Sequence, residues 1–229
     1  MNDTAKAAET GGKGGERQAE TQAERAFRLL EDALVRLDLP PGARVTEQEL
    51  ALRAGMGRTP VREAVQRLVA DGLIVVYPRK GMTVGAINPL EVLMALDVRG
   101  PVERVVAMAA ARRATPAQRA ALAETGEAMR AAAAKGDMAL YMRCDKAFDE
   151  TLAASAANPF ATRALAPLQT MVRRAWYYFR REPDLGASAE RHAAVASAVA
   201  AGDPEAAGDA SDALIAHLRA GLKQALAEL

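Results

Sequence analysis

Apolar residues recur at helical spacing in three successive segments near the start of the chain, which predicts three helices. The first helix is predicted to begin at Thr21, which has the spacing of a capping box with Glu24, and to stop before Pro40. Its apolar face carries Phe27, Leu30, Leu34 and Leu37. The second begins at Thr46 with the same kind of cap, and a turn at residues 55–57 separates it from the third.

The third predicted helix has Pro60 in its first turn, where a missing amide proton costs little. Its apolar stripe consists of Val61, Ala64, Val65, Leu68 and Val69. Asp71 ends the helix, and two short β-branched segments follow at residues 74–77 and 81–84. We expect these to be two strands of a hairpin with a basic turn between them.

Beyond residue 88 strand signals cease, and helix starts of one type recur: a capping residue followed by proline. These pairs are Asn88 and Pro89, Thr115 and Pro116, Asn158 and Pro159, and Asp203 and Pro204. Gly136 ends one further helix, and another is expected to begin near Ser188 after a loop at residues 183–186. The pattern predicts about six helices in this part of the chain.

These elements predict a mainly α protein in which a winged helix-turn-helix precedes an all-α bundle. Residues 1–20 lack apolar periodicity and are predicted to be a disordered tail; the expected domains are 21–87 and 88–229, with a hinge at 85–88. Composition agrees, because half of the 229 residues are hydrophobic but only 4% are aromatic, which favours packed helices over a β-sandwich.

The composition argues against several classes of protein. No apolar stretch is long enough to cross a bilayer, so no membrane partner is expected, and the single Cys144 cannot form an intramolecular disulfide. Both features favour a cytoplasmic protein. The formal net charge of +1 indicates no particular partner until the distribution of charge is considered.

Positive charge is concentrated around the third helix and the hairpin. Between residues 53 and 80 there are six basic and two acidic residues, as expected of a surface that contacts phosphates. Arg58 and Arg62 lie four apart near the start of the helix, from where a guanidinium can reach guanine O6 and N7. Thr59 is expected to contact a phosphate, and the wing tip is expected to contact the DNA backbone or minor groove. The wing-tip candidates are Arg79, Lys80 and Gly81. The alternative is a solvated charged face.

The segment from Leu39 to Glu47 and the run Arg58-Thr-Pro-Val-Arg-Glu-Ala, with Leu68, Gly72 and Leu73, resemble the GntR family of bacterial transcriptional regulators. The resemblance covers about residues 21–87 and implies that Gln48, Arg58, Thr59 and Arg62 touch operator DNA. Gly57 departs from the family, which usually has a capping serine at this position. A weaker cap and one lost phosphate contact would follow.

Residues 89–228 resemble the FadR-like branch of that family, whose helical ligand-binding domain is called FCD. The resemblance rests on Arg99 with Glu103, Asp145 to Phe148, Asn158, His192 and the Gly202–Asp203 junction. It implies a small carboxylate effector. Many members of this branch also bind a divalent metal ion through an Asp and three His, so the resemblance implies such a site here.

Four residues are candidate metal ligands: Asp145, Asp149, His192 and His217. The two aspartates lie four apart on one helix, the two histidines are the only ones in the chain, and such ligands suit Zn, Mn or Ni. Two departures from the family weaken this interpretation, because Asp149 replaces a usual histidine and Leu214 occupies the usual final histidine position. The alternative is a set of polar residues lining a helix bundle.

For an anionic effector, inward-facing arginines would provide bidentate recognition, and the candidates are Arg99, Arg143 and Arg173. Surface salt bridges are the alternative for each. Trp176 belongs to an aromatic cluster that ends at Phe179, which is expected to pack in a core or interface, or to place one ring in a ligand pocket.

We therefore predict a sequence-specific transcriptional regulator, by default a repressor, that binds a palindromic operator as a homodimer and responds to a small effector. One rival is a DNA-binding protein without a ligand. The other is a metal-dependent hydrolase, which the sequence does not favour because it contains no nucleophile elbow or phosphate loop. The protein is not expected to be an enzyme.

Overall fold

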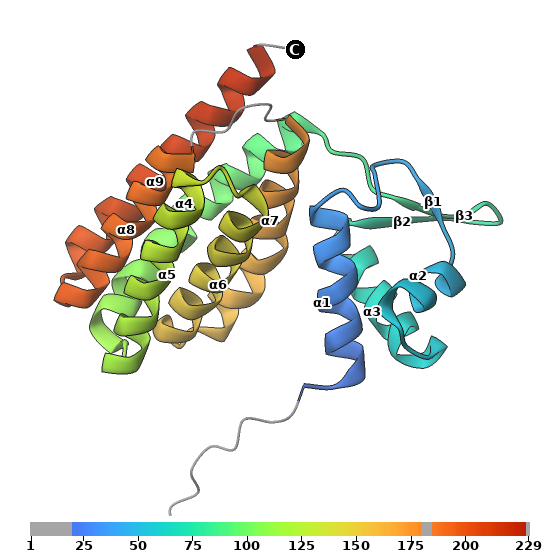
Figure 1. The fold of residues 1–229 in the computed structure, drawn as a ribbon, viewed down its shortest axis with the longest axis horizontal. Coiled ribbons are helices and arrows are strands. Elements are labelled where there is room, and N and C mark those ends of the chain that lie inside the picture. The colour runs from blue at the N-terminus through green and yellow to red at the C-terminus, as the bar shows by residue number, and fades with distance from the viewer. Residues whose placement is uncertain (1–19, 180–184, 228–229) are drawn as a thin grey trace, which may run out of the picture.

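The computed structural model describes residues 20–179 and 185–227, and its N-terminal part contains the predicted helices and hairpin (Figure 1). The helices are α1 (Gln22–Val35), α2 (Glu47–Ala54) and α3 (Arg58–Ala70). Both Thr21 and Thr46 form complete capping boxes, with Glu24 and Glu49 respectively. The predicted tail lies outside the described residues, apart from Glu20.

Within the described residues the small sheet has three strands, one more than the sequence pattern indicated. Strands β2 (Ile74–Tyr77) and β3 (Gly81–Val84) form the expected antiparallel hairpin. Strand β1 (Arg44–Val45) pairs with the other edge of β3, in the order β1-β3-β2. With only two residues, β1 is too short to show an alternating pattern, so its pairing was not predictable locally.

One apolar cluster joins these elements and includes Leu30 and Leu34 of α1, Leu50 of α2, Val61 and Leu68 of α3. The apolar stripe of α3 is therefore buried, except that Val69 is only partly buried. Because that stripe is turned inward, the opposite face of α3 is left at the surface of the molecule.

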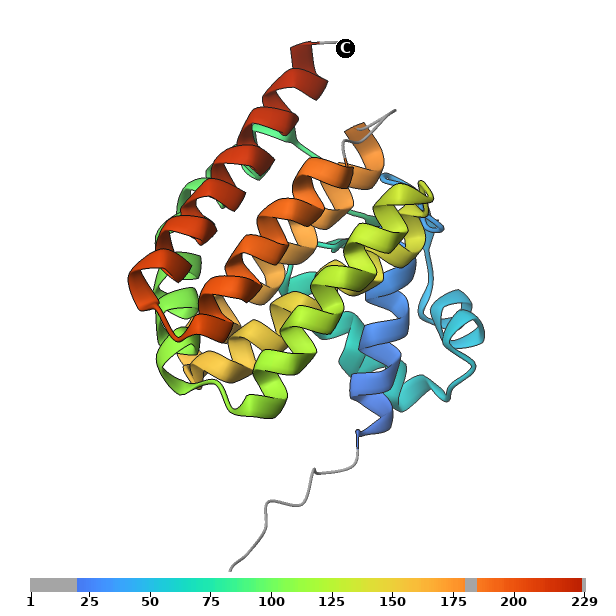
Figure 2. The same ribbon diagram turned by 60° about the vertical axis from the view of Figure 1, so that its left-hand side comes forward.

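The rest of the chain forms a bundle of six helices within the described residues (Figure 2). The helices are α4 (Pro89–Arg113), α5 (Pro116–Ala134), α6 (Met138–Ala156), α7 (Pro159–Phe179), α8 (Leu185–Ala201) and α9 (Pro204–Ala227). The predicted caps are present. For example, Thr115 forms a capping box with Gln118, and Asn158 Oδ1 accepts hydrogen bonds from the first turn of α7. Helix α4 packs against α6, α7, α8 and α9, and is thus central to the bundle.

Two predicted helix boundaries are wrong by a few residues. Helix α1 ends at Val35, so Leu37 does not lie on its apolar face as predicted, because the backbone at Leu37 turns to a positive φ of 63°. Helix α8 begins at Leu185 instead of near Ser188, so Gly186 lies inside a helix. The remainder of that predicted loop, residues 183–184, lies outside the described residues.

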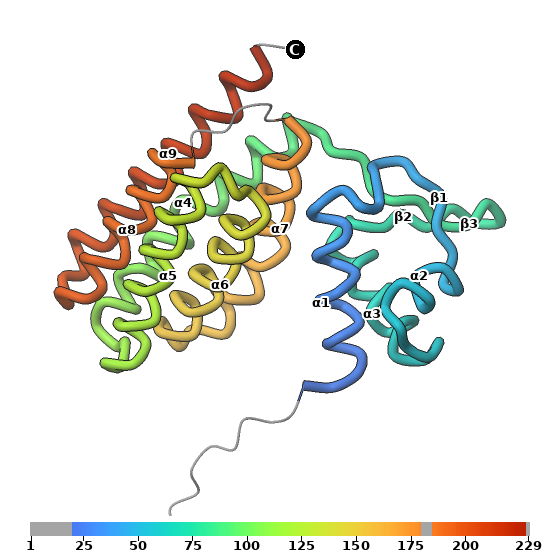
Figure 3. The backbone as a smooth tube through the Cα atoms, viewed as in Figure 1, coloured from blue at the N-terminus to red at the C-terminus, as the bar shows by residue number. Residues whose placement is uncertain are grey.

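The two parts of the chain contact each other through α1 and α7, which lie side by side in Figures 1 and 3. Glu31 of α1 is buried, accepts a hydrogen bond of 2.7 Å from the Thr170 hydroxyl and forms an ion pair with Lys146. Arg174, also on α7, donates a 2.6 Å hydrogen bond to the Gly85 carbonyl at the end of β3. The predicted hinge is thus anchored to α7.

Among the described residues, no helix is both long enough and apolar enough to span a membrane.

Candidate functional site

The exposed face of α3 carries the residues predicted to contact DNA. Arg58, Thr59 and Arg62 are exposed, whereas Val61, Ala64, Val65 and Leu68 on the other face are buried. Within the described part of the chain, Arg58 makes no side-chain hydrogen bond or ion pair. Its guanidinium is therefore available to a ligand at the N-terminus of α3, where the helix dipole favours an anion.

The N-cap of α3 is Gly57, and no side chain caps this helix. Two other helices of the same domain, α1 and α2, begin with complete capping boxes. The first-turn amides of α3 consequently lack a side-chain acceptor at the N-cap, as the predicted departure from the family pattern implies. A DNA phosphate oxygen is one acceptor that suits them.

The tip of the hairpin is a tight turn of exposed residues. Arg79 adopts a positive φ of 64°, Gly81 one of 92°, and the Lys80 amide donates to the Tyr77 carbonyl. Arg79, Lys80 and Gly81 are all exposed. The turn thus presents two basic side chains at the end of β2 and β3, as a wing does.

Two residues at the start of α2 lie near this surface. Gln48, which the family resemblance implied, is exposed. Its neighbour Glu47 accepts hydrogen bonds from Arg62 Nε at 3.2 Å and from Arg62 Nη2 at 3.0 Å. Sequence analysis missed this pair because its members are 15 residues apart on two helices, and no sequence periodicity relates them.

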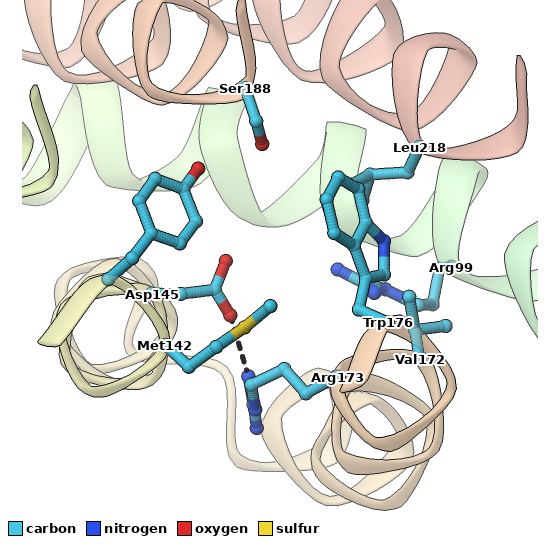
Figure 4. Close-up of a pocket in the computed structure, with 9 residues that line it drawn as sticks. Arg99, Met142, Asp145, Val172, Arg173, Trp176, Ser188 and Leu218 are labelled. Atoms are coloured by element: carbon cyan, nitrogen blue, oxygen red, sulfur yellow. Dashed lines mark hydrogen bonds and ion pairs between the residues drawn. The ribbon is translucent and has the colours of Figure 1, made fainter. Parts of the chain in front are cut away.

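A small pocket lies within the bundle and is lined by two of the predicted arginines (Figure 4). Its lining residues are Arg99, Tyr141, Met142, Asp145, Val172, Arg173, Trp176, Ser188 and Leu218. They come from helices α4, α6, α7, α8 and α9, so the pocket is formed jointly by five helices of the bundle. One aromatic ring, that of Trp176, enters the pocket wall, which is one of the two alternatives the sequence left open.

Arg173 lies between two of the predicted metal ligands. Its Nη1 atom donates to Asp149 Oδ2 at 2.7 Å and to Asp145 Oδ2 at 3.3 Å. The other Asp145 oxygen lies 3.2 Å from His192 Nε2, and His192 Nδ1 lies 2.8 Å from the Ser188 carbonyl. These four side chains form a buried ionic cluster, which we call the Arg173 cluster.

The environment separates the pKa values of the two aspartates. Burial would raise the pKa of Asp145, but the hydrogen bond and charge of His192, with Arg173 and Arg99, lower it to about 2. Burial and repulsion by Asp145 raise the pKa of Asp149 to about 7, despite the opposing attraction of Arg173. The buried imidazole of His192 has a raised pKa because its contacts with Asp145 outweigh the effect of burial. Asp145 is thus the anion of the cluster.

The residues present do not fit the predicted metal ion. Among the described residues, no three His, Cys, Asp or Glu side chains are grouped as ligands of one ion. The guanidinium of Arg173 already occupies the position between Asp145 and Asp149, and His217 is not a member of the Arg173 cluster. A second cation in the same place would be repelled by the first.

Arg99 and Arg143 differ in their surroundings. Arg99 is buried, its Nε and Nη2 atoms each lie 2.7 Å from Glu103 Oε1, and Gln169 donates to the same oxygen. Arg143 is exposed and lines a different cleft, which lies between α1 and helices α6 and α7. Of the three candidates, Arg99 and Arg173 line the pocket inside the bundle, whereas Arg143 is exposed on α6 and does not. Ser188 was missed, since a lone serine has no sequence signal.

Comparison with known proteins finds a family match for each of the two parts of the chain. Residues 22–84 match the family described as bacterial regulatory proteins, gntR family, and residues 94–219 match the FCD domain. A relative from Agrobacterium vitis, an uncharacterised HTH-type transcriptional regulator in the TAR-I ttuE-ttuC' intergenic region, is 35% identical over 58% of this chain and 80% of its own. The probable D-xylose utilization operon transcriptional repressor of Paenarthrobacter nicotinovorans is 30% identical over 86% of this chain and 84% of its own.

The solved structure of E. coli McbR/YncC has the same fold, with a TM-score of 0.78, 24% identity, and coverage of 90% of this chain and 98% of that one. The winged helix-turn-helix with its exposed basic face, together with the two family matches and these relatives, defines a DNA-binding transcriptional regulator. The chain belongs to the GntR family and carries an FCD domain, which is a small-molecule effector-binding domain.

Proposed function

We propose that this chain is a repressor that reads its operator with α3 and the β2–β3 wing. The observation that carries the proposal is the exposure of Arg58, Thr59 and Arg62 on one face of a helix whose other face is buried. Arg58 and Arg62 would contact guanines, while Thr59, Gln48 and the wing tip at residues 79–81 would contact phosphates or groove edges. Such a protein works where the chromosome is, in the cytoplasm.

We further propose that two copies bind a palindromic operator. Helix α4 supports a homodimer because its surface carries a row of large exposed apolar side chains. These are Leu90 (62% exposed), Met94 (62%), Val98 (52%) and Val105 (53%). The first three are spaced four residues apart, so they share one helical face. Burial of such a row against the same row of a second copy would relate two α3 helices by a two-fold axis.

The effector is proposed to bind in the small pocket lined by Arg99, Arg173 and Trp176 and to be a small carboxylate. Arg99 supports this assignment, because it is buried, lines the pocket and contacts Glu103 through its Nε and Nη2 atoms. The Ser188 hydroxyl and the Trp176 ring would then set the size and shape of the acid. No metal ion enters this proposal, because Arg173 already supplies the positive charge beside the pocket.

Helix α7 offers a route from the pocket to the DNA-binding domain. Gln169 and Arg173 face the bundle, whereas Thr170 and Arg174 bind Glu31 of α1 and the carbonyl of Gly85. A shift of α7 that accommodates an effector would therefore move both contacts at once. Only an effector that favours one placement of α7 over the other would change operator affinity, and loss of affinity would relieve repression.

The DNA-binding proposal is tested by selecting duplexes from a randomised library and comparing the wild type with Arg58→Ala and Arg62→Ala. We expect the wild type to enrich an inverted repeat, and each substitution to weaken binding roughly tenfold and to remove one base preference per half-site. Arg191→Ala is the control, since Arg191 is exposed on α8 and carries the same charge. Enrichment of no motif by the folded wild type would refute operator reading.

The effector proposal is tested by thermal unfolding of the same protein with a panel of small organic acids, with and without a chelator. An acid present at a hundredfold over its dissociation constant should stabilise the native state by about 2.7 kcal/mol, and chelation should not change the shift. The acid should also lower operator affinity. If no acid shifts the transition and operator binding is unaffected, the ligand-independent alternative is favoured.

A further inference from the structure

The pair formed by Glu47 and Arg62 joins the two helices of the DNA-reading motif at its exposed surface. Arg62 Nε lies 3.3 and 3.2 Å from the two Glu47 carboxylate oxygens, and Nη2 lies 3.0 Å from Oε2. The Arg62 side chain is 62% exposed and that of Glu47 35%. An exposed pair of this kind adds little to fold stability, so its arrangement calls for a different explanation.

The geometry of the contact determines which donors remain. A guanidinium has five N–H groups in one plane, and the carboxylate of Glu47 occupies the side edge formed by Nε and Nη2. The outer edge, with one N–H from Nη1 and one from Nη2, is left free. Those two parallel donors are the pair that matches guanine O6 and N7.

Glu47 is free to hold Arg62 because it has no part in capping its own helix. The capping box of α2 uses Thr46 and Glu49, and Glu47 is the first residue of the helix proper. Its backbone is thereby fixed by a helix terminus that other residues stabilise. The Glu47 side chain therefore extends from a fixed backbone position, and its two hydrogen bonds restrict a long, otherwise mobile arginine side chain.

We propose that Glu47 is a positioning residue for sequence reading: it orients the guanidinium of Arg62 so that its outer edge recognises a guanine. This inference rests on the proposed operator reading and deepens it. Glu47 also places a negative charge next to DNA phosphates, which weakens binding to any sequence. The residue thus lowers general affinity for DNA and raises the preference for the correct base, which is the combination that specificity requires.

The test uses the full-length protein and a randomised duplex library, with sequencing of the bound fraction for the wild type, Glu47→Gln, Arg62→Ala and the double variant. Arg62→Ala identifies the base position that Arg62 reads. Glu47→Gln should reduce the guanine preference at that same position by roughly tenfold, while binding to unselected DNA becomes tighter. The double variant should show no further loss of preference, and Glu47→Asp should retain part of it.

Glu63→Gln is the matched control, because Glu63 is an exposed neighbour on α3 whose neutralisation removes the same charge. It should tighten general binding without changing any base preference. Thermal unfolding of each variant verifies the fold, which a change at this exposed pair is not expected to affect.

Two outcomes would overturn the inference while leaving operator reading intact. One is an unchanged guanine preference in Glu47→Gln at the position that Arg62→Ala abolishes. The other is a loss of preference at a different position, which would make Glu47 a direct reader of a cytosine amino group. By contrast, a wild type that enriches no motif would refute the proposed function itself.

Discussion

Replacement of Arg173 by methionine should lower the free energy of unfolding by about 3–5 kcal/mol, the range typical of removing one partner from a buried ionic group. The side chain is 9% exposed, and its guanidinium is the cation that binds both Asp145 and Asp149. Methionine has a similar volume but leaves Asp149 without the cation that binds it most closely, while Asp145 keeps only its contact with His192. Urea unfolding monitored by circular dichroism measures the loss.

Removal of the second partner provides a sharper check. In the double variant Arg173→Met with Asp149→Asn, the carboxyl group that lost its cation can no longer ionise, so above about pH 7 the penalty should be clearly smaller than for Arg173→Met alone. Arg191→Met is the control for loss of an exposed arginine and should change stability by no more than about 0.5 kcal/mol. Wild-type stability in Arg173→Met would show that the cluster does not depend on this cation.

The Arg173 cluster also shows which features of the site sequence analysis could predict. Asp145, Asp149 and His192 were predicted to lie together because helical spacing and the family resemblance both pointed to them. The cation that the two aspartates bind was not predictable from the sequence. Arg173 lies on a different helix, and only tertiary packing brings it to the aspartates. The residue that departs from the family, Asp149, is the one that binds Arg173 most closely. A sequence departure thus becomes interpretable only with its spatial neighbour.

The fold was predictable to a greater degree, because its determinants are local. Capping residues followed by proline located the starts of α4, α5, α7 and α9, and apolar periodicity located the buried face of α3. Features that depend on distant segments were missed, such as strand β1 and the contact of Glu31 with Thr170, whose partners are 139 residues apart. The contact between the two domains belongs to this second group, and so does any coupling that runs through it.

Replacement of Gly85 by alanine should destabilise the protein by roughly 3 kcal/mol, because the added Cβ would lie 2.4 Å from the Gly72 carbonyl oxygen. That oxygen belongs to the backbone, so no side-chain rotation relieves the clash. Gly85 also donates to the Leu73 carbonyl and accepts from Arg174, so its displacement would strain the junction of α3, the wing and α7 together.

The matched control for this substitution is Gly100→Ala in α4, where the new Cβ would lie 3.7 Å from Ile215, at ordinary contact distance. Alanine is favoured over glycine inside a helix, so this variant should gain up to about 1 kcal/mol. Thermal unfolding of both variants measures the two opposite shifts. If Gly85→Ala retained wild-type stability, the junction would be able to open by a few tenths of an ångström or more. The contacts between the hinge, the wing and α7 would then be too loosely packed to transmit a shift of α7 to the DNA-binding domain.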